Sequence, residues 1–206
     1  MVRQYLDKPI PEEVRTLLDR RIEENNKRHN IDMKLVTGDK SGIWSLMKLV
    51  ARNVNNYIVL AGDENPDLDE SIGYASADIM LYAQTLGLNT WWVGGTFNKS
   101  VQKFVGEKKV VGIVAVGYGA TQGKQHKMKT YSDVAAYQGE APEWFKNGVE
   151  IALLAPTAVN RMGVTFTGAG NEVHLEAVTG PFSIVDKGIV KYHFELGAGT
   201  ENFQWI

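Results

Sequence analysis

The chain has 206 residues, 44% of them hydrophobic, which is the composition of a globular protein with one sizeable core or two small halves that share one. A formal net charge of −2 argues against a general binder of nucleic acid or membrane surfaces, and no apolar run approaches a membrane span. Because cysteine is absent, disulfides, thiol catalysis and thiolate metal sites are excluded, and we expect a cytoplasmic protein.

The first quarter of the chain combines helical and extended patterns. A helix begins near Pro11, which suits a first helical turn, and is expected to end at Asn25 and Asn26. The next predicted elements are, in chain order, a strand at 33–36, a helix from about Ser41 to Asn53 and a strand at 57–60.

An acidic segment at 62–70 superficially resembles a calcium loop. It has Leu68 and Tyr74 where such a loop needs glycine and glutamate, so we expect a solvated loop. Asp69 or Ser71 is then placed to cap the following helix.

The segment from Leu86 to Phe97, L-G-L-N-T-W-W-V-G-G-T-F, follows a helical run with one buried face. Gly87 is expected to end that helix in a left-handed turn, and residues 90–93 favour a strand. The pair Gly94–Gly95 lets another group approach bare backbone, and Asn98 is placed to cap a further helix. Taken alone, the segment predicts a core strand and a tight turn; backbone N–H groups aimed at a flat ligand are the alternative.

The segment Lys109–Gly117 is a nearly continuous apolar run, typical of a strand covered on both faces. Gly117 and Gly119 resemble the start of a dinucleotide-binding motif. That motif needs glycine or alanine where the chain has Gln122, and a helix where a basic loop follows. We therefore reject a Rossmann-type site.

The rest of the chain predicts, in order, a basic loop at 124–129, a short segment at 130–133, a loop at 140–143, a helix from Gly148 to Leu154 capped by Asn147, strands at 163–167 and 172–178, and a helix from about Val185 to Leu196. This last helix echoes the earlier one. At a constant offset of 110, Ile189, Tyr192, Leu196, Gly197 and Thr200 match Ile79, Tyr82, Leu86, Gly87 and Thr90. Two related halves about a pseudo-twofold axis are inferred, because a repeat is usually one structural unit.

Conventional catalytic constellations are missing. The histidines are scattered without metal-ligand spacing, and no serine lies in a nucleophile elbow, so we expect no metal site. Lys127 and Lys129 stand two apart in an extended loop, where both can grip one phosphate or serve as solvated surface charge. Residues 155–161 stop an apolar helix at Pro156 and present Thr157 and Asn160, which suit a polyol ligand or a simple helix end.

Together these segments resemble the FMN-dependent nitroreductase and NAD(P)H oxidase family. Its members open with R-S-x-R-x-[FY], and residues 2–10 resemble the tail of that motif. The family motifs L-G-L-G-T-x-W-x-G, G-Y followed by K/R-x-[KR], and P-S-A-x-N-x-Q-P-W are matched at 86–95, at 117–129 and, in the first half of the motif, at 155–164. The last motif follows the first helix in ordinary members. Here it lies in the C-terminal half, as in a smaller branch of nitroreductases.

The resemblance implies an α+β nitroreductase-like fold, with a central mixed sheet flanked by helices and two pseudo-repeated halves. These halves, about 1–105 and 106–206, would share one core in a single globule of residues 1–206. FMN would be the cofactor, NADH or NADPH the reductant, and a nitroaromatic, quinone or similar small molecule the acceptor. Ordinary members are homodimers, so a homodimer or a monomeric pseudo-dimer is implied, without nucleic-acid or membrane partners.

By motif position the resemblance assigns several residues to FMN binding, and it assigns no side chain to catalysis because flavin N5 carries the hydride. The phosphate would be held by Arg3, Lys127 and Lys129. The ribityl chain or ring edge would face Thr157 and Asn160, and the ring would be lined by Pro156 and Ala158. Backbone would be presented to the isoalloxazine by Trp92, Gly94 and Gly95.

Two departures from the family pattern keep a second hypothesis open. The first arginine and the serine of R-S-x-R are absent, and Met162-Gly163-Val164 replaces glutamine–proline–tryptophan, which removes one amide partner. A buried polar group left unpaired costs roughly 1–3 kcal/mol, or about one to two decades of affinity. The alternative is a degenerate nitroreductase-fold scaffold that binds flavin or another ligand weakly without turnover.

Overall fold

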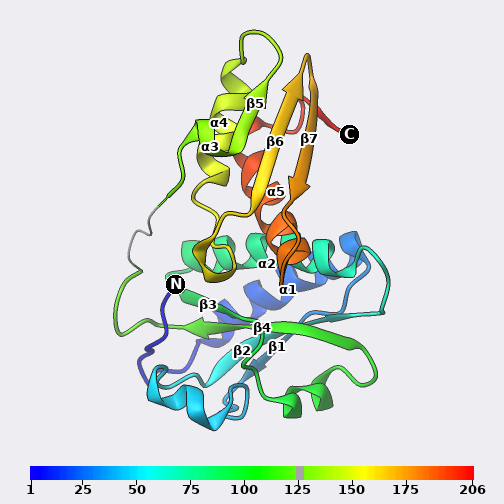
Figure 1. Cartoon of the computed structure of the whole chain (residues 1–206). Coiled ribbons are helices and arrows are strands. Elements are labelled where there is room, and N and C mark those ends of the chain that lie inside the picture. Colours follow the sequence, from blue (N-terminus) through cyan, green and yellow to red (C-terminus); the bar gives the residue numbers. More distant parts are fainter. Residues whose placement is uncertain (124–127) are drawn as a thin grey trace. The chain divides into compact units, whose positions relative to one another are not determined.

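The computed structural model describes residues 1–123 and 128–206, apart from the side chains of Lys48 and Val159. The chain forms two compact units, each with a four-stranded sheet and helices (Figure 1). Unit 1 comprises Met1–Leu68 and Asp78–Lys124, and unit 2 comprises Asp69–Ala77 and Gln125–Ile206. Helix α2 (Leu68–Thr85) therefore contributes residues to both units.

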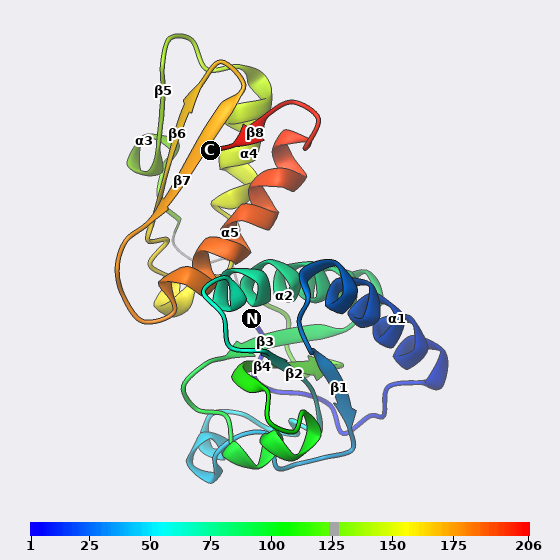
Figure 2. The same ribbon diagram turned by 90° about the vertical axis from the view of Figure 1, so that its right-hand side faces the viewer.

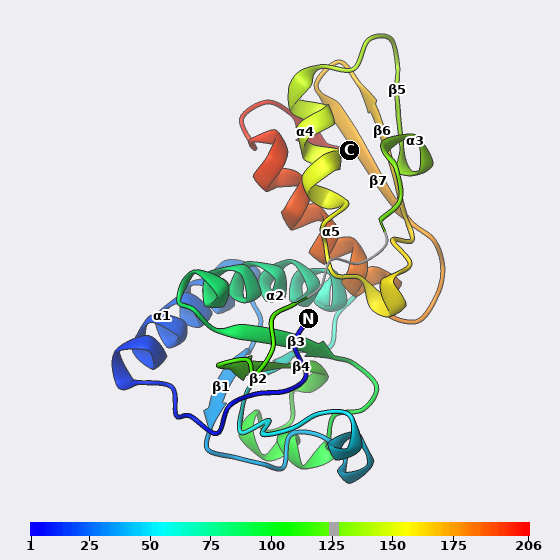
Figure 3. The ribbon, with the colours of Figure 1, turned by 90° about the vertical axis from the view of Figure 1, so that its left-hand side faces the viewer.

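Unit 1 is built on an antiparallel sheet with the strand order β1-β2-β4-β3. The strands are β1 (Lys34–Thr37), β2 (Asn56–Gly62), β3 (Asn89–Val93) and β4 (Lys109–Gly117). β4 lies between β2 and β3 and is buried over residues 112–117, which confirms the prediction of a strand covered on both faces. Helix α1 (Glu12–His29) and the unit 1 part of α2 cover one face; the 3-10 helices η1 (Ser45–Leu49) and η2 (Lys99–Phe104) lie on the other (Figures 2 and 3).

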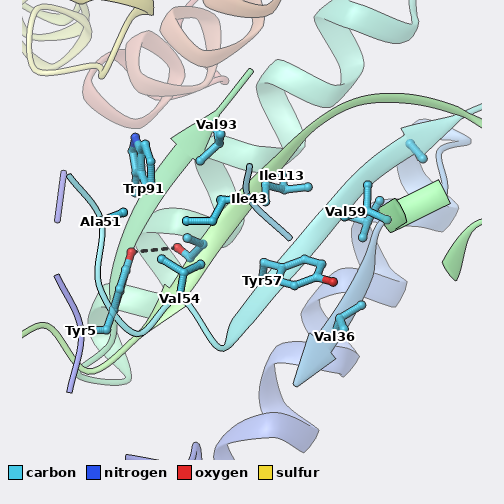
Figure 4. Packing of buried hydrophobic residues seen from close by; sticks show 13 residues of the cluster. Tyr5, Val36, Ile43, Ala51, Val54, Tyr57, Val59, Trp91, Val93 and Ile113 are labelled. Carbon is cyan, nitrogen blue, oxygen red and sulfur yellow. Dashed lines mark hydrogen bonds between the residues drawn. The ribbon is translucent and has the colours of Figure 1, made fainter. Parts of the chain in front are cut away.

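The core on the 3-10 side of this sheet follows the strand alternation. Tyr57 and Val59 of β2 and Ile113 of β4 point into it, as does Trp91 of β3 (Figure 4). The N-terminal segment closes this core, because Tyr5 Oη donates a hydrogen bond to the Ala115 carbonyl at 3.3 Å. Burial raises the pKa of the Tyr5 hydroxyl, which keeps it a proton donor.

Unit 2 has a mixed sheet with the strand order β5-β6-β7-β8. Its strands are β5 (Ala135–Tyr137), β6 (Val164–Ala169), β7 (Glu172–Ala177) and β8 (Gln204–Trp205), and only the central β6–β7 pair is antiparallel. Its helical segments are α3 (Tyr131–Val134), α4 (Glu143–Ala152), η3 (Ala158–Asn160) and α5 (Ser183–Ala198), besides the start of α2. Helices α4 and α5 pack on one face of the sheet (Figure 2), where the rings of Phe145, Phe166 and Phe194 meet.

The predicted α+β class, with sheet flanked by helices, is confirmed. In place of one central mixed sheet there are two sheets, an antiparallel one in unit 1 and a mixed one in unit 2. Two local predictions are also confirmed. Gly87 ends α2 with a φ of 77°, and the Asn98 side chain accepts a hydrogen bond from the Ser100 amide at the start of η2.

The predicted helix from Ser41 to Asn53 is wrong except for η1. Gly42 lies flush against Tyr57, since a Cβ at Gly42 would be 2.5 Å from the Tyr57 Cε1 atom. Its neighbour Ile43 forms a β-bridge with Phe97. These tertiary contacts hold the start of the segment outside a helix, so the helix that its periodicity predicts does not form there.

Three helices begin or end at other residues than the sequence predicts. Asn26 does not end α1, because its amide group donates to the Met33 carbonyl at 2.9 Å and accepts from the Met33 N–H at 2.8 Å. The helix continues to His29 and ends at Asn30, which has left-handed φ and ψ. Helix α4 begins after Pro142 instead of at Asn147, and α2 begins at Leu68 without a side-chain cap.

Candidate functional site

The residues predicted to bind FMN divide between the two units. Unit 1 contains Arg3, Trp92, Gly94 and Gly95, and unit 2 contains Lys129, Pro156, Thr157, Ala158 and Asn160. Lys127 lies outside the described residues.

In unit 1 the structure brings Arg3 to strand β3. The Val2 N–H donates to the Thr90 carbonyl at 3.1 Å, and the Arg3 guanidinium lies 5.3 Å from the centre of the Trp91 ring. Trp92 points to the opposite face of the sheet, where its ring covers Gly112. Arg3 is thus adjacent to the predicted backbone segment, against Trp91 and not Trp92.

The turn after β3 leaves backbone accessible. Gly94 is half-buried and Gly95 is exposed, and a Cβ at Gly95 would meet no atom within 4 Å. The open space at Gly95 leaves room for another group to approach the backbone there.

In unit 2 residues 155–162, here called the motif loop, join α4 to β6 through η3. Inside the loop the Met162 N–H donates to Thr157 Oγ1 at 3.0 Å, and the Asn160 N–H donates to the Thr157 carbonyl at 3.0 Å. Asn160 and Met162 have positive φ values of 61° and 42°. A non-glycine residue in this region stores roughly 1–3 kcal/mol of strain, so surrounding contacts must hold the loop in shape.

Lys129 is one of those contacts. Its Nζ donates to the Met162 carbonyl at 3.0 Å, which brings together two parts of the predicted phosphate and ribityl site. The side chain is exposed, and an ammonium group has three N–H donors, so two remain for an anion. Asn160 is exposed as well, and among the described residues its amide group has no hydrogen-bond partner.

Thr157 and Ala158 are less available than the sequence indicates. Thr157 is 5% exposed, and its hydroxyl oxygen already accepts from Met162. The Ala158 N–H donates to Asp186, at 2.8 Å to Oδ1 and 3.0 Å to Oδ2. The groups of the motif loop that fit an FMN molecule are therefore the free donors of Lys129 and Asn160, with the half-buried Pro156 as an apolar neighbour.

Sequence reasoning missed Asp186, which lies in the first turn of α5 and is 9% exposed. Burial raises the pKa of its carboxyl group to about 6, and the Ala158 hydrogen bond acts in the opposite direction. The sequence contained a signal for the importance of Asp186. Asp186 and His193 are seven residues apart and share the helical face of the buried residues Ile189 and Val190, where polar side chains are unexpected.

The predicted residues do not line the hollows found within the units. A hollow of about 420 Å³ lies beside β5, β6 and β7, and hollows of about 380 and 260 Å³ lie in unit 1 near Lys40 and Asn55. None of these three is lined by a residue assigned to FMN.

Two further searches were negative for the part of the chain that the structure describes. No cluster of three or more histidine, aspartate or glutamate side chains is arranged to hold a metal ion. No helix has both the length and the apolar character needed to cross a membrane.

Comparison with solved structures identifies the same fold in nitroreductases. A crystal structure described as a putative nitroreductase from Thermotoga maritima aligns with 95% of this chain and 78% of its own, at 20% identity and a TM-score of 0.69. An FMN-dependent nitroreductase from Clostridium difficile R20291 aligns with 65% of this chain and 91% of its own, at 19% identity and a TM-score of 0.52. A protein described as a putative NADH dehydrogenase/NAD(P)H nitroreductase from Parabacteroides distasonis aligns with 65% and 89%, at 18% identity and a TM-score of 0.50.

Comparison with curated proteins finds no match. A family model described as "Putative TM nitroreductase" matches residues 1–198. The prediction of a nitroreductase-family oxidoreductase is confirmed at the level of the family, and the chain belongs to the TM nitroreductase family.

Proposed function

We propose that the protein is an FMN-dependent oxidoreductase that uses NADH or NADPH to reduce a nitroaromatic, a quinone or a similar small molecule. The observation that carries this proposal is the family match over residues 1–198. The similar protein from Clostridium difficile is described as FMN-dependent, and the one from Parabacteroides distasonis as an NAD(P)H nitroreductase. We further propose that the chain belongs to the branch with the P-[ST]-A-x-N motif in the C-terminal half.

The residues of this chain would bind and orient the cofactor. When bound, FMN would supply the redox chemistry of hydride transfer from the nicotinamide to the acceptor. Lys129, with Lys127 and Arg3, would neutralise the phosphate, and the Asn160 amide would bond the ribityl chain or ring edge. Pro156 and Ala158 would line the ring, Thr157 would fix the loop around them, and Trp92, Gly94 and Gly95 would offer backbone.

The rival reading is a scaffold that binds flavin weakly without turnover. One observation favours it. The backbone N–H and carbonyl of Met162 already form hydrogen bonds within unit 2, to Thr157 and to Lys129, so they are engaged without a ligand. The visible spectrum of the purified protein, before and after addition of FMN and then NADH or NADPH, decides between them. Bound yellow flavin that is bleached by either nicotinamide supports the enzyme, and a protein that FMN does not perturb supports the scaffold.

The phosphate assignment is tested by replacing Lys127 and Lys129 together with glutamine. Glutamine removes the charge of Lys129 but keeps a donor for the Met162 carbonyl, so the motif loop is less disturbed than it would be by alanine. Two lost charge-assisted contacts, discounted for exposure, should weaken FMN binding at least about tenfold. Riboflavin, which lacks the phosphate, should bind as in wild type.

The control is Lys146→Gln, at a half-exposed lysine of α4 in the same unit that pairs with Glu143. This substitution removes one positive charge at a position outside the motif loop, and it should change the affinity for neither FMN nor riboflavin. Equal FMN affinity in wild type and the double variant would show that the basic loop does not hold the phosphate.

Assembly and location stay predictions. We propose one globule of residues 1–206, as a monomeric pseudo-dimer or a homodimer, acting in the cytoplasm on a small molecule. Sedimentation equilibrium over a range of protein concentrations distinguishes the two assemblies.

A further inference from the structure

Asp186 is a buried carboxylate without a cationic partner. It is 9% exposed, and among the described residues it forms no ion pair. Both of its oxygens accept the same N–H, that of Ala158, at 2.8 and 3.0 Å. Ala158 is the first residue of η3, so its N–H has no carbonyl partner within the short helix, and Asp186 caps η3 from a distant part of the chain.

The motif loop needs such a cap because its backbone is strained at Asn160 and Met162. Three side chains hold it. Thr157 binds the Met162 N–H within the loop, Lys129 binds the Met162 carbonyl from the preceding segment, and Asp186 binds Ala158 from α5. Among the described residues, Asp186 alone ties the loop to a long helix by a side-chain hydrogen bond, and this tie alone carries a negative charge.

The negative charge is retained in an unfavourable place. Burial raises the pKa of Asp186 to about 6, and no charged side chain contributes to that shift. The cations Lys187 and Lys191 of α5 are engaged by Glu70 of α2, and the Lys129 ammonium by the Met162 carbonyl. His193 of the same helix is buried, which lowers its pKa, and its ring bonds the Ile189 carbonyl. A carboxylate kept at a cost to stability indicates a use in function.

We propose that Asp186 is a positioning residue that holds the motif loop in its flavin-binding shape through the Ala158 N–H. This inference rests on the proposed function, because the loop is the predicted contact of the ribityl chain and ring. Asp186 itself touches no cofactor; it acts through the backbone of Ala158.

The hydrogen bond between Asp186 and Ala158 should depend on pH. Above pH 6 the carboxylate is ionised and accepts the Ala158 N–H with two charged oxygens; below pH 6 it takes up a proton and becomes a weaker acceptor. The loop should therefore bind flavin more weakly at pH 5 than at pH 8. Riboflavin is the suitable probe, because the FMN phosphate titrates in the same range.

The experiment compares riboflavin and FMN binding to wild type and Asp186→Asn by fluorescence quenching. Asparagine has nearly the same shape but offers one uncharged acceptor oxygen, so both flavins should bind about tenfold more weakly at pH 8. Riboflavin affinity should fall between pH 8 and pH 5 in wild type and stay constant in the variant. Unchanged affinity for both flavins, or the same pH profile in both proteins, overturns the proposal.

The control is Glu172→Gln, which removes one negative charge from an exposed residue of β7 in the same unit. It should leave both affinities and the pH profile as in wild type. If it reproduced the effect of Asp186→Asn, the effect would be one of net charge, and the positioning role would be overturned.

A second readout needs no flavin and separates this inference from the proposed function. Amide hydrogen exchange of the Ala158 N–H should be slow in wild type at pH 8 and faster in Asp186→Asn. If wild type binds neither flavin, the proposed function fails; faster exchange in the variant then still supports the tie to Ala158. Equal exchange in the two proteins overturns it.

Discussion

Two buried aspartates show how charge is treated differently at the residue scale. Asp78 of α2 is 4% exposed and accepts hydrogen bonds from Arg21 at 2.6 and 2.7 Å and from Asn25 at 2.6 Å. Asp186 is buried, has no cationic partner among the described residues, and accepts one backbone N–H. The charge of Asp78 is compensated by a cation inside the fold, and the charge of Asp186 is not. Removing the cation that pairs with Asp78 should therefore lower the stability of the protein, whereas removing the charge of Asp186 should raise it.

Replacing Arg21 with alanine should destabilise unit 1. The change leaves the Asp78 carboxylate buried with its paired cation removed, which should lower the free energy of unfolding by about 2–4 kcal/mol, allowing for the partial exposure of Arg21. Chemical denaturation measures this loss. Arg20→Ala is the matched control, since the Arg20 side chain is 79% exposed and, among the described residues, pairs with Glu24 alone; it should change the stability by less than about 0.5 kcal/mol. Equal effects of the two substitutions would contradict the buried ion pair.

Replacing Asp186 with asparagine should stabilise the protein, and only at higher pH. The pKa of this carboxyl is about 6 in the folded protein and about 3.8 in the unfolded chain, so ionisation opposes folding as the pH rises through this window. With allowance for screening by solvent, the gain at pH 8 should be about 1–2 kcal/mol, and it should vanish near pH 4. Urea denaturation at both pH values checks this. A variant less stable than wild type at pH 8 would mean that the bond to Ala158 outweighs the cost of the buried charge.

At the element scale the contact between α2 and α5 within unit 2 is reciprocal. Gly73 of α2 lies against the Val185 carbonyl, and Gly188 of α5 lies against the Glu70 carbonyl. Each glycine thus touches the residue three positions before the other glycine. This is the pattern of a local twofold axis, and it relates the two helices at an offset of 115, five residues from the offset of the sequence matches.

The order of elements repeats as well. The series α1-β1-β2-α2-β3 corresponds to α4-β6-β7-α5-β8, and both contain an antiparallel strand pair, a helix and a strand parallel to the second of the pair. In unit 1 strand β4 is inserted between β2 and β3. The motif loop lies between α4 and β6, so it follows the first helix of its repeat, as it does in ordinary members of the family that the sequence resembles.

Replacing Gly188 with alanine should destabilise the protein strongly. A Cβ there would overlap the Glu70 carbonyl oxygen, which belongs to helix backbone and cannot move aside easily. Helix propensity alone favours alanine by about 1 kcal/mol, so the sign of the effect is informative. We expect a loss of at least about 2 kcal/mol in the free energy of unfolding, measured by denaturation. Gly180→Ala, in open space with no positive φ, is the control and should be close to neutral. A stabilising Gly188→Ala would exclude the close helix contact.

At the scale of the whole molecule α2 is the shared element. Its residues Asp69–Ala77 belong to unit 2 and Asp78–Thr85 to unit 1, within one continuous helix. Helix formation is cooperative, so loss of one part of α2 should destabilise the other. We therefore propose that the two units unfold in a single transition, which agrees with the prediction of one globule.

Tryptophan fluorescence tests this cooperativity. One variant keeps only Trp91, in unit 1, and another keeps only Trp205, in unit 2. Their urea midpoints should coincide when the other tryptophans are replaced by phenylalanine. Insertion of two glycines between Ala77 and Asp78 interrupts α2 and should separate the two midpoints. Separate midpoints in the uninterrupted chain would show that the units unfold independently.

The sequence by itself determined the elements whose pattern is local. The apolar run of β4, the left-handed Gly87 and the Asn98 cap follow from side-chain size, glycine conformation and short-range hydrogen bonding, which do not depend on distant residues. The family was also determined by motifs of adjacent residues, and residues 1–198 match its model.

The tertiary structure decided what depends on partners far along the chain. Gly42 and Ile43 are held outside a helix by Tyr57 and Phe97, so the predicted helix there is mostly absent. Asp186 lies 28 residues from Ala158, and no local pattern pairs a first-turn aspartate with that N–H. The offset of 115 between α2 and α5 is set by Gly73 and Gly188, which allow the two helix backbones to approach each other. The spacing of apolar residues within one helix does not specify how that helix packs against another.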